Sequence, residues 1–103
     1  MTVLDKPLAL THGWADDWWC ITDERGARIA GADIEGTGEE MGAIADAIDA
    51  RSRVSFKRCA VLCQQDRDEV DLWSPRNSIN HVTVPLARAK ALAVAIRAAL
   101  EAA

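Results

Sequence analysis

The chain has 103 residues, of which 50% are hydrophobic and 27% charged, a composition typical of folded rather than disordered chains. At this length we expect one domain, residues 1–103, with an ordinary hydrophobic core. The sequence predicts no signal peptide, since no basic segment precedes an apolar one, and no membrane span, since no stretch approaches about 18 apolar residues. Three cysteines in such a chain predict buried, reduced thiols and a cytoplasmic location.

The net charge of −4 conceals a difference between the two halves. The first 50 residues carry eleven acids and three bases, a balance of −8, whereas from Arg51 onward nine bases outnumber five acids, a balance of +4. Phosphate contacts need Lys and Arg, so the acidic half argues against nucleic acid as its direct partner. It suits a basic or nucleic-acid-processing protein, although a surface that only keeps the chain soluble is the alternative.

Three strands are predicted first. Val3–Leu10 can pair at a sheet edge, where Pro7 is tolerated. Trp18–Thr22 and Arg28–Ile34 are predicted strands on either side of a turn at residues 23–26, in which Gly26 can supply a positive φ.

A helix follows. Thr37 and Glu40 have the spacing of a capping box, in which each side chain accepts a hydrogen bond from the other residue's backbone N–H. The next apolar residues recur at helical spacing, so we expect a helix that ends near Arg51 or Ser52; its stripe is Met41, Ile44, Ala45 and Ile48.

The second half predicts a central strand, a hairpin and a closing helix. Val54–Gln64 is strand-like, with an apolar run at residues 59–63. Glu69–Trp73 and Ile79–Val84 flank Ser-Pro-Arg-Asn at 74–77, the preferred order for a type I turn. Pro85 suits the first position of the last helix, whose apolar stripe is Leu86, Ala89, Leu92, Ala93, Ile96 and Leu100.

These elements predict an α+β fold: an antiparallel sheet of five or six strands with two helices packed on one face. The order strand-strand-strand-helix occurs twice and breaks near Ser52, which allows an internal duplication.

No catalytic or metal-binding pattern emerges. Four residues of strand would separate Cys59 and Cys63 by roughly 13 Å, too far for one metal ion, so we expect neither metal nor cofactor. No nucleophile elbow, phosphate loop or dinucleotide fingerprint is present, and we expect no enzyme. A cysteine paired in space with His81 is the one enzymatic alternative left open.

Four tryptophans among five aromatic residues indicate a binding surface. Trp18 and Trp19 are adjacent in a strand and point to opposite faces, so we expect one of them, together with Trp73, on the sheet face that two helices leave uncovered. The alternative is that the N-terminal segment folds across this face and buries these tryptophans. Trp14 lies in a loop beside acids, and Arg76 at a turn. The expected partner-binding residues are Trp14, Asp16, Asp17, Trp18, Glu39, Glu40, Trp73 and Arg76.

One segment carries a resemblance. VDLWSPRNS at 70–78, VTVP at 82–85 and LAVAIR at 92–97 together resemble the C-terminal part of small accessory proteins of phages and prophages in high-GC bacteria. The resemblance implies a genomic setting that includes inhibitors of host defence, among them anti-CRISPR proteins, which dock on a nuclease complex or block its DNA path. It carries no site residues with it.

We therefore expect a non-enzymatic protein-binding module, of the kind that a phage encodes to inhibit a host defence complex such as a CRISPR effector. The expected partner is a protein, with no direct contact to nucleic acid or membrane. The alternatives are a phage accessory protein that self-associates, as a homodimer, and a small cysteine-dependent enzyme.

Overall fold

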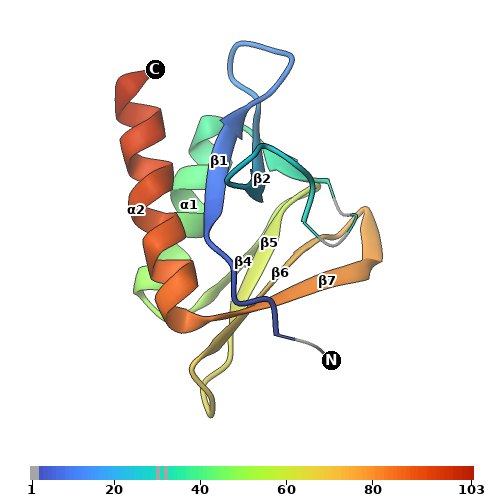
Figure 1. The fold of residues 1–103 in the computed structure, drawn as a ribbon, viewed down its shortest axis with the longest axis vertical. Helices are drawn as coiled ribbons and strands as arrows, with labels where there is room; N and C mark the ends of the chain where they lie inside the picture. The colour runs from blue at the N-terminus through green and yellow to red at the C-terminus, as the bar shows by residue number, and fades with distance from the viewer. Residues whose placement is uncertain (1–2, 30, 32) are drawn as a thin grey trace.

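The computed structural model describes residues 3–29, 31 and 33–103, except for the side chains of residues 78–80. The strands form two antiparallel sheets, one of three strands and one of four (Figure 1). The elements are β1 (Leu8–His12), β2 (Trp19–Asp23), β3 (Ile34–Gly36), α1 (Gly38–Asp49), β4 (Arg53–Ser55), β5 (Ala60–Cys63), β6 (Glu69–Ser74), β7 (Asn77–Pro85) and α2 (Leu86–Ala102). The α+β class is confirmed, whereas the single sheet of five or six strands is wrong.

The expected strand Val54–Gln64 is two strands. A turn closed by the backbone N–H of Phe56, which donates to the Cys59 carbonyl at 2.8 Å, separates β4 from β5. Lys57 and Arg58 occupy this turn, so their charges mark the interruption in an otherwise apolar segment. The apolar run itself is confirmed as a strand, because β5 is paired on both sides.

The expected third strand Arg28–Ile34 is also displaced. β3 begins at Ile34, and Arg28 makes only an isolated bridge to Thr22; residues 30 and 32 of the expected strand lie outside the described part. The backbone N–H of Glu35 donates to the Arg58 carbonyl at 3.1 Å, which links β3 to the β4–β5 turn and so joins the two sheets.

The N-terminal segment contacts both sheets. Val3 bridges Thr83 of β7 in parallel, and the Leu4 N–H donates to the Thr83 carbonyl at 2.7 Å. The chain then enters β1, which starts at Leu8 rather than Val3 and pairs with β2. The element order is therefore three strands and a helix, then four strands and a helix, which departs from two equal halves.

The helices and sheets bury one core. α1 packs against β4 and β5, and α2 packs against β1, β6 and β7 and against α1. Apolar side chains from both helices and both sheets are fully buried, each contributing roughly 1.5–3 kcal/mol by burial: Ile21, Ile34, Met41, Ile44, Ile48, Leu72, Leu92 and Ile96. No helix in the described residues has the length and apolarity needed to cross a membrane.

The capping box and the two turns predicted from short sequence patterns are confirmed. The Thr37–Glu40 capping box is present, with the Glu40 N–H donating to Thr37 Oγ1 at 3.2 Å and the Thr37 N–H donating to Glu40 Oε1 at 2.9 Å. Gly26 has φ +84°. The turn after Ser74 pairs it with Asn77. Pro85, expected at the first position of the last helix, is instead the N-cap of α2, whose first residue is Leu86.

Candidate functional site

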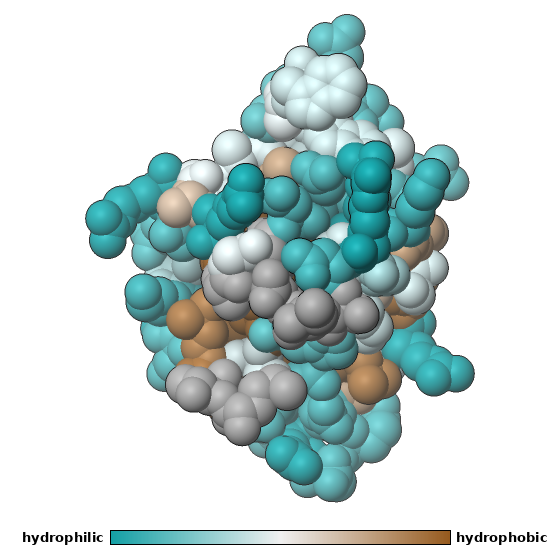
Figure 2. Space-filling model, turned by 90° about the vertical axis from the view of Figure 1, so that its right-hand side faces the viewer, coloured by the Kyte–Doolittle hydropathy of each residue, from teal (hydrophilic) through white to brown (hydrophobic). Residues whose placement is uncertain are grey.

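The connection between β1 and β2 projects from the body of the molecule, at the top of Figure 1 and of Figure 2. Trp14 is 89% exposed there, whereas Trp19 is only 7% exposed and Trp18 and Trp73 are half-buried. The only other exposed large apolar side chains in the described residues are Val3 and Val94. Trp14 is therefore the largest apolar side chain that the described part of the fold leaves in solvent.

This projecting segment is held in shape by hydrogen bonds. The Gly13 N–H donates to the Trp18 carbonyl at 2.6 Å, and the Trp18 N–H donates to the Ala15 carbonyl at 3.2 Å. His12 Nε2 donates to the Asp16 carbonyl at 2.8 Å. A Cβ on Gly13 would lie 2.8 Å from Trp18 Cδ1, so glycine is required for this close approach. The Trp14 backbone is thus preorganised.

A bond across 21 residues ties the segment to α1. Asp17 Oδ1 accepts a hydrogen bond at 2.9 Å from the backbone N–H of Gly38, the first residue of α1. Glu39 is exposed and follows Gly38 directly, so it lies at the same end of the helix. We call Trp14, Asp16, Asp17 and Glu39 the acidic tip. The fold thus brings together four of the eight expected binding residues.

The acidic tip has uncompensated charge. Asp5, Asp33, Glu35, Asp46 and Asp49 each form an ion pair with an arginine. No carboxylate of the acidic tip forms an ion pair within the part of the chain that the structure describes. Glu40, by contrast, is engaged in the capping box, and Asp17 caps α1 in addition to its place in the tip. Helix capping therefore accounts for Glu40 and for part of Asp17, but not for Asp16 or Glu39.

The other expected residues lie elsewhere. Trp18 is half-buried immediately before β2, where the Arg58 guanidinium lies 5.6 Å from its ring centroid, a cation–π contact. Trp73 is half-buried on β6 and stacks on His81 with ring centroids 4.9 Å apart and planes at 16°. Arg76 is exposed in the β6–β7 turn. Neither contact was expected: Trp18 and Arg58 are 40 positions apart, and the stack of Trp73 on His81 depends on the register of the β6–β7 hairpin.

A polar hollow of about 510 Å³ lies beside Arg76, where the two sheets meet. Two of its arginines are already paired, Arg28 with Asp33 at 2.9 Å and Arg58 with Glu35 at 3.2 Å. Figure 2 shows the side of the molecule that carries the β6–β7 turn: it is mostly hydrophilic, with small, separate hydrophobic areas.

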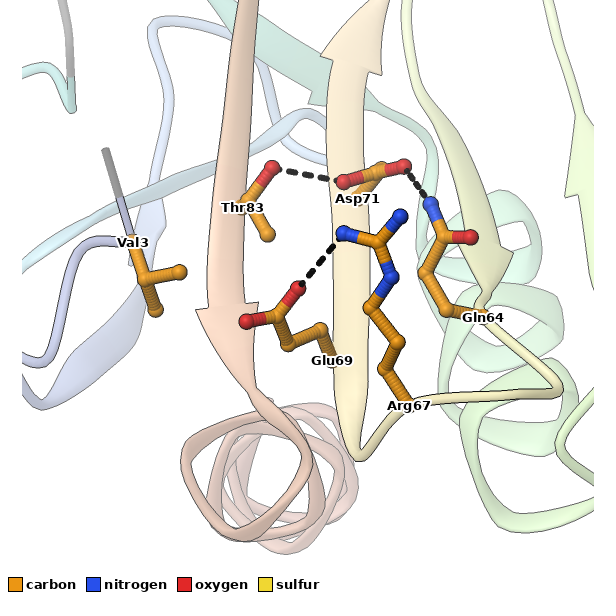
Figure 3. Close-up of a pocket in the computed structure, with 6 residues that line it drawn as sticks. All are labelled: Val3, Gln64, Arg67, Glu69, Asp71 and Thr83. Atoms are coloured by element: carbon orange, nitrogen blue, oxygen red, sulfur yellow. Dashed lines mark hydrogen bonds and ion pairs between the residues drawn. The ribbon is translucent and has the colours of Figure 1, made fainter. Parts of the chain in front are cut away.

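A second polar cluster lies toward the other end of the four-stranded sheet, away from the β6–β7 turn (Figure 3). Asp71 on β6 accepts hydrogen bonds from Gln64 and from Thr83 Oγ1, the latter at 2.6 Å, while Arg67 lies 3.8 Å from Glu69. The hollow beside it measures about 290 Å³. Both oxygens of the Asp71 carboxylate accept hydrogen bonds. We therefore interpret the cluster as structural: it links β6 to β7 and to the residue that follows β5.

The cysteine thiols are poor nucleophiles at neutral pH. Burial, followed by the Glu35 charge and its hydrogen bond, raises the pKa of Cys20 to about 11. Burial and the nearby Glu40 charge raise the pKa of Cys59 to about 12, and burial also raises the pKa of Cys63. Cys59 and Cys63 are buried as expected, but Cys20 is half-exposed and so departs from that expectation. In the described residues no three His, Cys, Asp or Glu side chains are grouped so as to hold a metal ion.

No protein-family model, no curated protein and no solved structure matches the chain. The function is therefore inferred from the geometry and charge of the chain's own residues.

Proposed function

We propose that the chain is a non-enzymatic protein-binding module that docks on a basic protein surface through the acidic tip. The observation that carries the proposal is the 89% exposure of Trp14 on a segment that hydrogen bonds hold in shape. Tryptophan is among the residues that most often dominate binding energy, and it does so when it enters a desolvated pocket.

The energetics favour this use of Trp14. An indole buries about 200 Å² on docking, which is worth roughly 5 kcal/mol before the costs of association. Those costs include the ordering of loops at the interface. The bonds of Gly13 and Trp18, together with the bond from Gly38 to Asp17, already order the tip in the free protein.

The charge of the acidic tip defines the kind of partner. Its carboxylates form no ion pair with any described residue, so no described Lys or Arg neutralises them and they attract a basic partner during encounter. Surfaces that bind DNA or RNA are basic because they neutralise phosphates. A nucleic-acid-processing protein therefore fits the tip, and the resemblance to phage accessory proteins points to the same class. On this basis we propose an inhibitor of a host defence complex, such as a CRISPR effector.

Charge reversal tests the proposal. The tagged protein captures partners from a lysate of the source organism at low and moderate salt, and mass spectrometry quantifies them. Reversing Asp16 and Glu39 together to Lys should reduce capture at low salt and weaken its salt dependence. Reversing Glu24 and Glu101 together to Lys is the matched control, because it changes the net charge by the same amount at two exposed acids that lie outside the acidic tip and form no ion pair with a described residue. If both variants lose partners equally, net charge rather than the acidic tip is responsible.

A further inference from the structure

The outer face of the four-stranded sheet carries a second, separate feature. The inward residues Val61, Leu72 and Val82 are buried against the helices. Their neighbours along the strands point to the other face, where no helix packs in the described fold. Trp73 of β6 and His81 of β7 stack there, 4.9 Å apart and nearly parallel. This stack belongs to neither the core nor the acidic tip.

A hollow adjoins the stack. It measures about 530 Å³, within the range of ligand pockets, and its lining is mainly apolar. Arg53, Ser55, Leu62 and Trp73 line it from the outer face, and Val54 and Val61, which belong to the inward face by register, complete the lining. In the strand order β4-β5-β6-β7, the hollow lies on the β5 side of Trp73 and His81 lies on the β7 side. A planar ring that enters the hollow therefore meets Trp73 from the side that His81 does not occupy.

The sheet is electrically polar along its strands. β4 and β6 run in the same direction, so the β4–β5 and β6–β7 turns lie at one end of the sheet. These turns carry Lys57, Arg58 and Arg76 and no acid; we call these three residues the basic end. The β5–β6 turn, with Asp66, Arg67 and Asp68 and so one acid more than its bases, lies at the opposite end, at the bottom of Figure 1.

Part of this positive charge is uncompensated. Arg58 pairs with Glu35, but Lys57, Arg76 and the pocket-lining Arg53 form no ion pair with any described residue. Trp73 lies between Arg53 and Arg76 along the strand direction, since Arg53 is level with Asp71 and Arg76 follows Trp73. A ring stacked on Trp73 would therefore have Arg53 toward one end of the strands and Arg76 toward the other.

We propose that this face binds single-stranded nucleic acid, with a base stacked on Trp73 in the hollow and phosphates at Arg53 and the basic end. Aromatic stacking flanked by Lys and Arg is the chemistry by which proteins hold single strands without sequence preference. A duplex offers this site little, because its bases are already stacked and paired. The expectation of no direct nucleic-acid contact rested on the acidic half, whereas this site lies in the half with a charge of +4.

Fluorescence anisotropy with a fluorescein-labelled oligothymidylate of about ten nucleotides, a length typical for one small domain, tests the proposal at low salt. Trp73→Ala should weaken binding by about tenfold, as expected for loss of one stacked base. Arg76→Glu should weaken it and flatten its salt dependence. Trp14→Ala is the matched control, because it removes a tryptophan of the acidic tip and should leave oligonucleotide binding unchanged. This experiment is independent of the protein-binding proposal.

Three results would overturn the inference: no binding of the oligonucleotide at low salt, unchanged binding by Trp73→Ala, or equal competition by polyglutamate. The last result would identify an acidic protein segment as the occupant of the hollow. Circular dichroism checks that each variant is folded. If Trp73→Ala is not, Trp73→Leu retains an apolar side chain without a stacking ring and should still lose binding, whereas Trp73→Phe should retain most of it.

Discussion

Asp17 and Gly38, 21 residues apart, are joined by a hydrogen bond of 2.9 Å from the backbone N–H of Gly38 to the Asp17 carboxylate. The bond satisfies an N–H at the start of α1 that the helix itself leaves free, and it places a negative charge at the positive end of the helix dipole. The same bond fixes the acidic tip against the body of the protein. Stability and binding geometry therefore depend on one side chain.

Asp17→Ala should lower the free energy of unfolding by about 1 kcal/mol, the usual cost of losing a helix cap. Urea unfolding followed by circular dichroism measures it. Asp16→Ala is the control and should change stability by less than about 0.5 kcal/mol, because the Asp16 side chain is exposed and only its backbone carbonyl is bonded. Equal effects of the two substitutions would mean that the bond to Gly38 contributes nothing.

Two glycines should respond oppositely to alanine. A Cβ on Gly13 would lie 2.8 Å from Trp18 Cδ1 and 2.9 Å from the Trp18 carbonyl oxygen, so Gly13→Ala should destabilise the protein and disturb the acidic tip. A Cβ on Gly42 in α1 meets only Leu100 Cδ1, at 4.0 Å. Gly42→Ala should therefore stabilise the protein by about 0.5–1 kcal/mol. Thermal unfolding compares the two; a stabilising Gly13→Ala would contradict the described contact.

The raised pKa of Cys59 should lower the free energy of unfolding at alkaline pH. Its pKa is about 12 in the folded protein and near 9.0 in the unfolded chain, so above pH 9.0 only the unfolded chain releases the thiol proton. The unfolded state then binds fewer protons, and stability falls by roughly 1.4 kcal/mol per pH unit over that window. Urea unfolding from pH 8 upward, in the wild type and in Cys59→Ala, measures the difference in slope. Identical slopes would show that Cys59 ionises normally.

Thiol labelling tests the enzymatic alternative. With its pKa raised to about 11, Cys20 should react slowly with iodoacetamide at neutral pH, although it is half-exposed. The buried Cys59 and Cys63 should react only after unfolding. Glu35→Gln removes the charge that contributes to the raised pKa and should speed the labelling of Cys20. Rapid labelling of one cysteine in the folded wild type would instead favour a cysteine-dependent enzyme.

Local patterns predicted the fold where the interactions are local. The capping box at Thr37 and Glu40 joins residues three apart, and the apolar stripe of α1 joins residues within two turns, so both were readable in the sequence. The division into two sheets was not. It depends on which strands pair with one another, and the bond from the Glu35 N–H to the Arg58 carbonyl, which joins the two sheets, links residues 23 positions apart that no local pattern connects.

The candidate site follows the same distinction. The exposure of Trp14 could be anticipated from its Gly and Asp neighbours, which favour a loop. The half-burial of Trp18 under Arg58 could not, because these residues are 40 positions apart and meet only where the sheets join. The bond from Gly38 to Asp17 likewise could not be predicted from the sequence. It brings Asp16 and Asp17 of the β1–β2 connection to the end of α1 that carries Glu39.

The comparison of Trp14→Ala with Val94→Ala tests the central claim most directly. Each substitution truncates an exposed apolar side chain, one in the acidic tip and one on α2, where Val94 is 68% exposed. Quantitative mass spectrometry then measures which proteins each tagged variant captures from lysate of the source organism. The acidic tip predicts that a stoichiometric basic partner is retained by the wild type and by Val94→Ala and lost by Trp14→Ala. Equal capture of that partner by all three proteins, or no specific partner for the wild type, would contradict it.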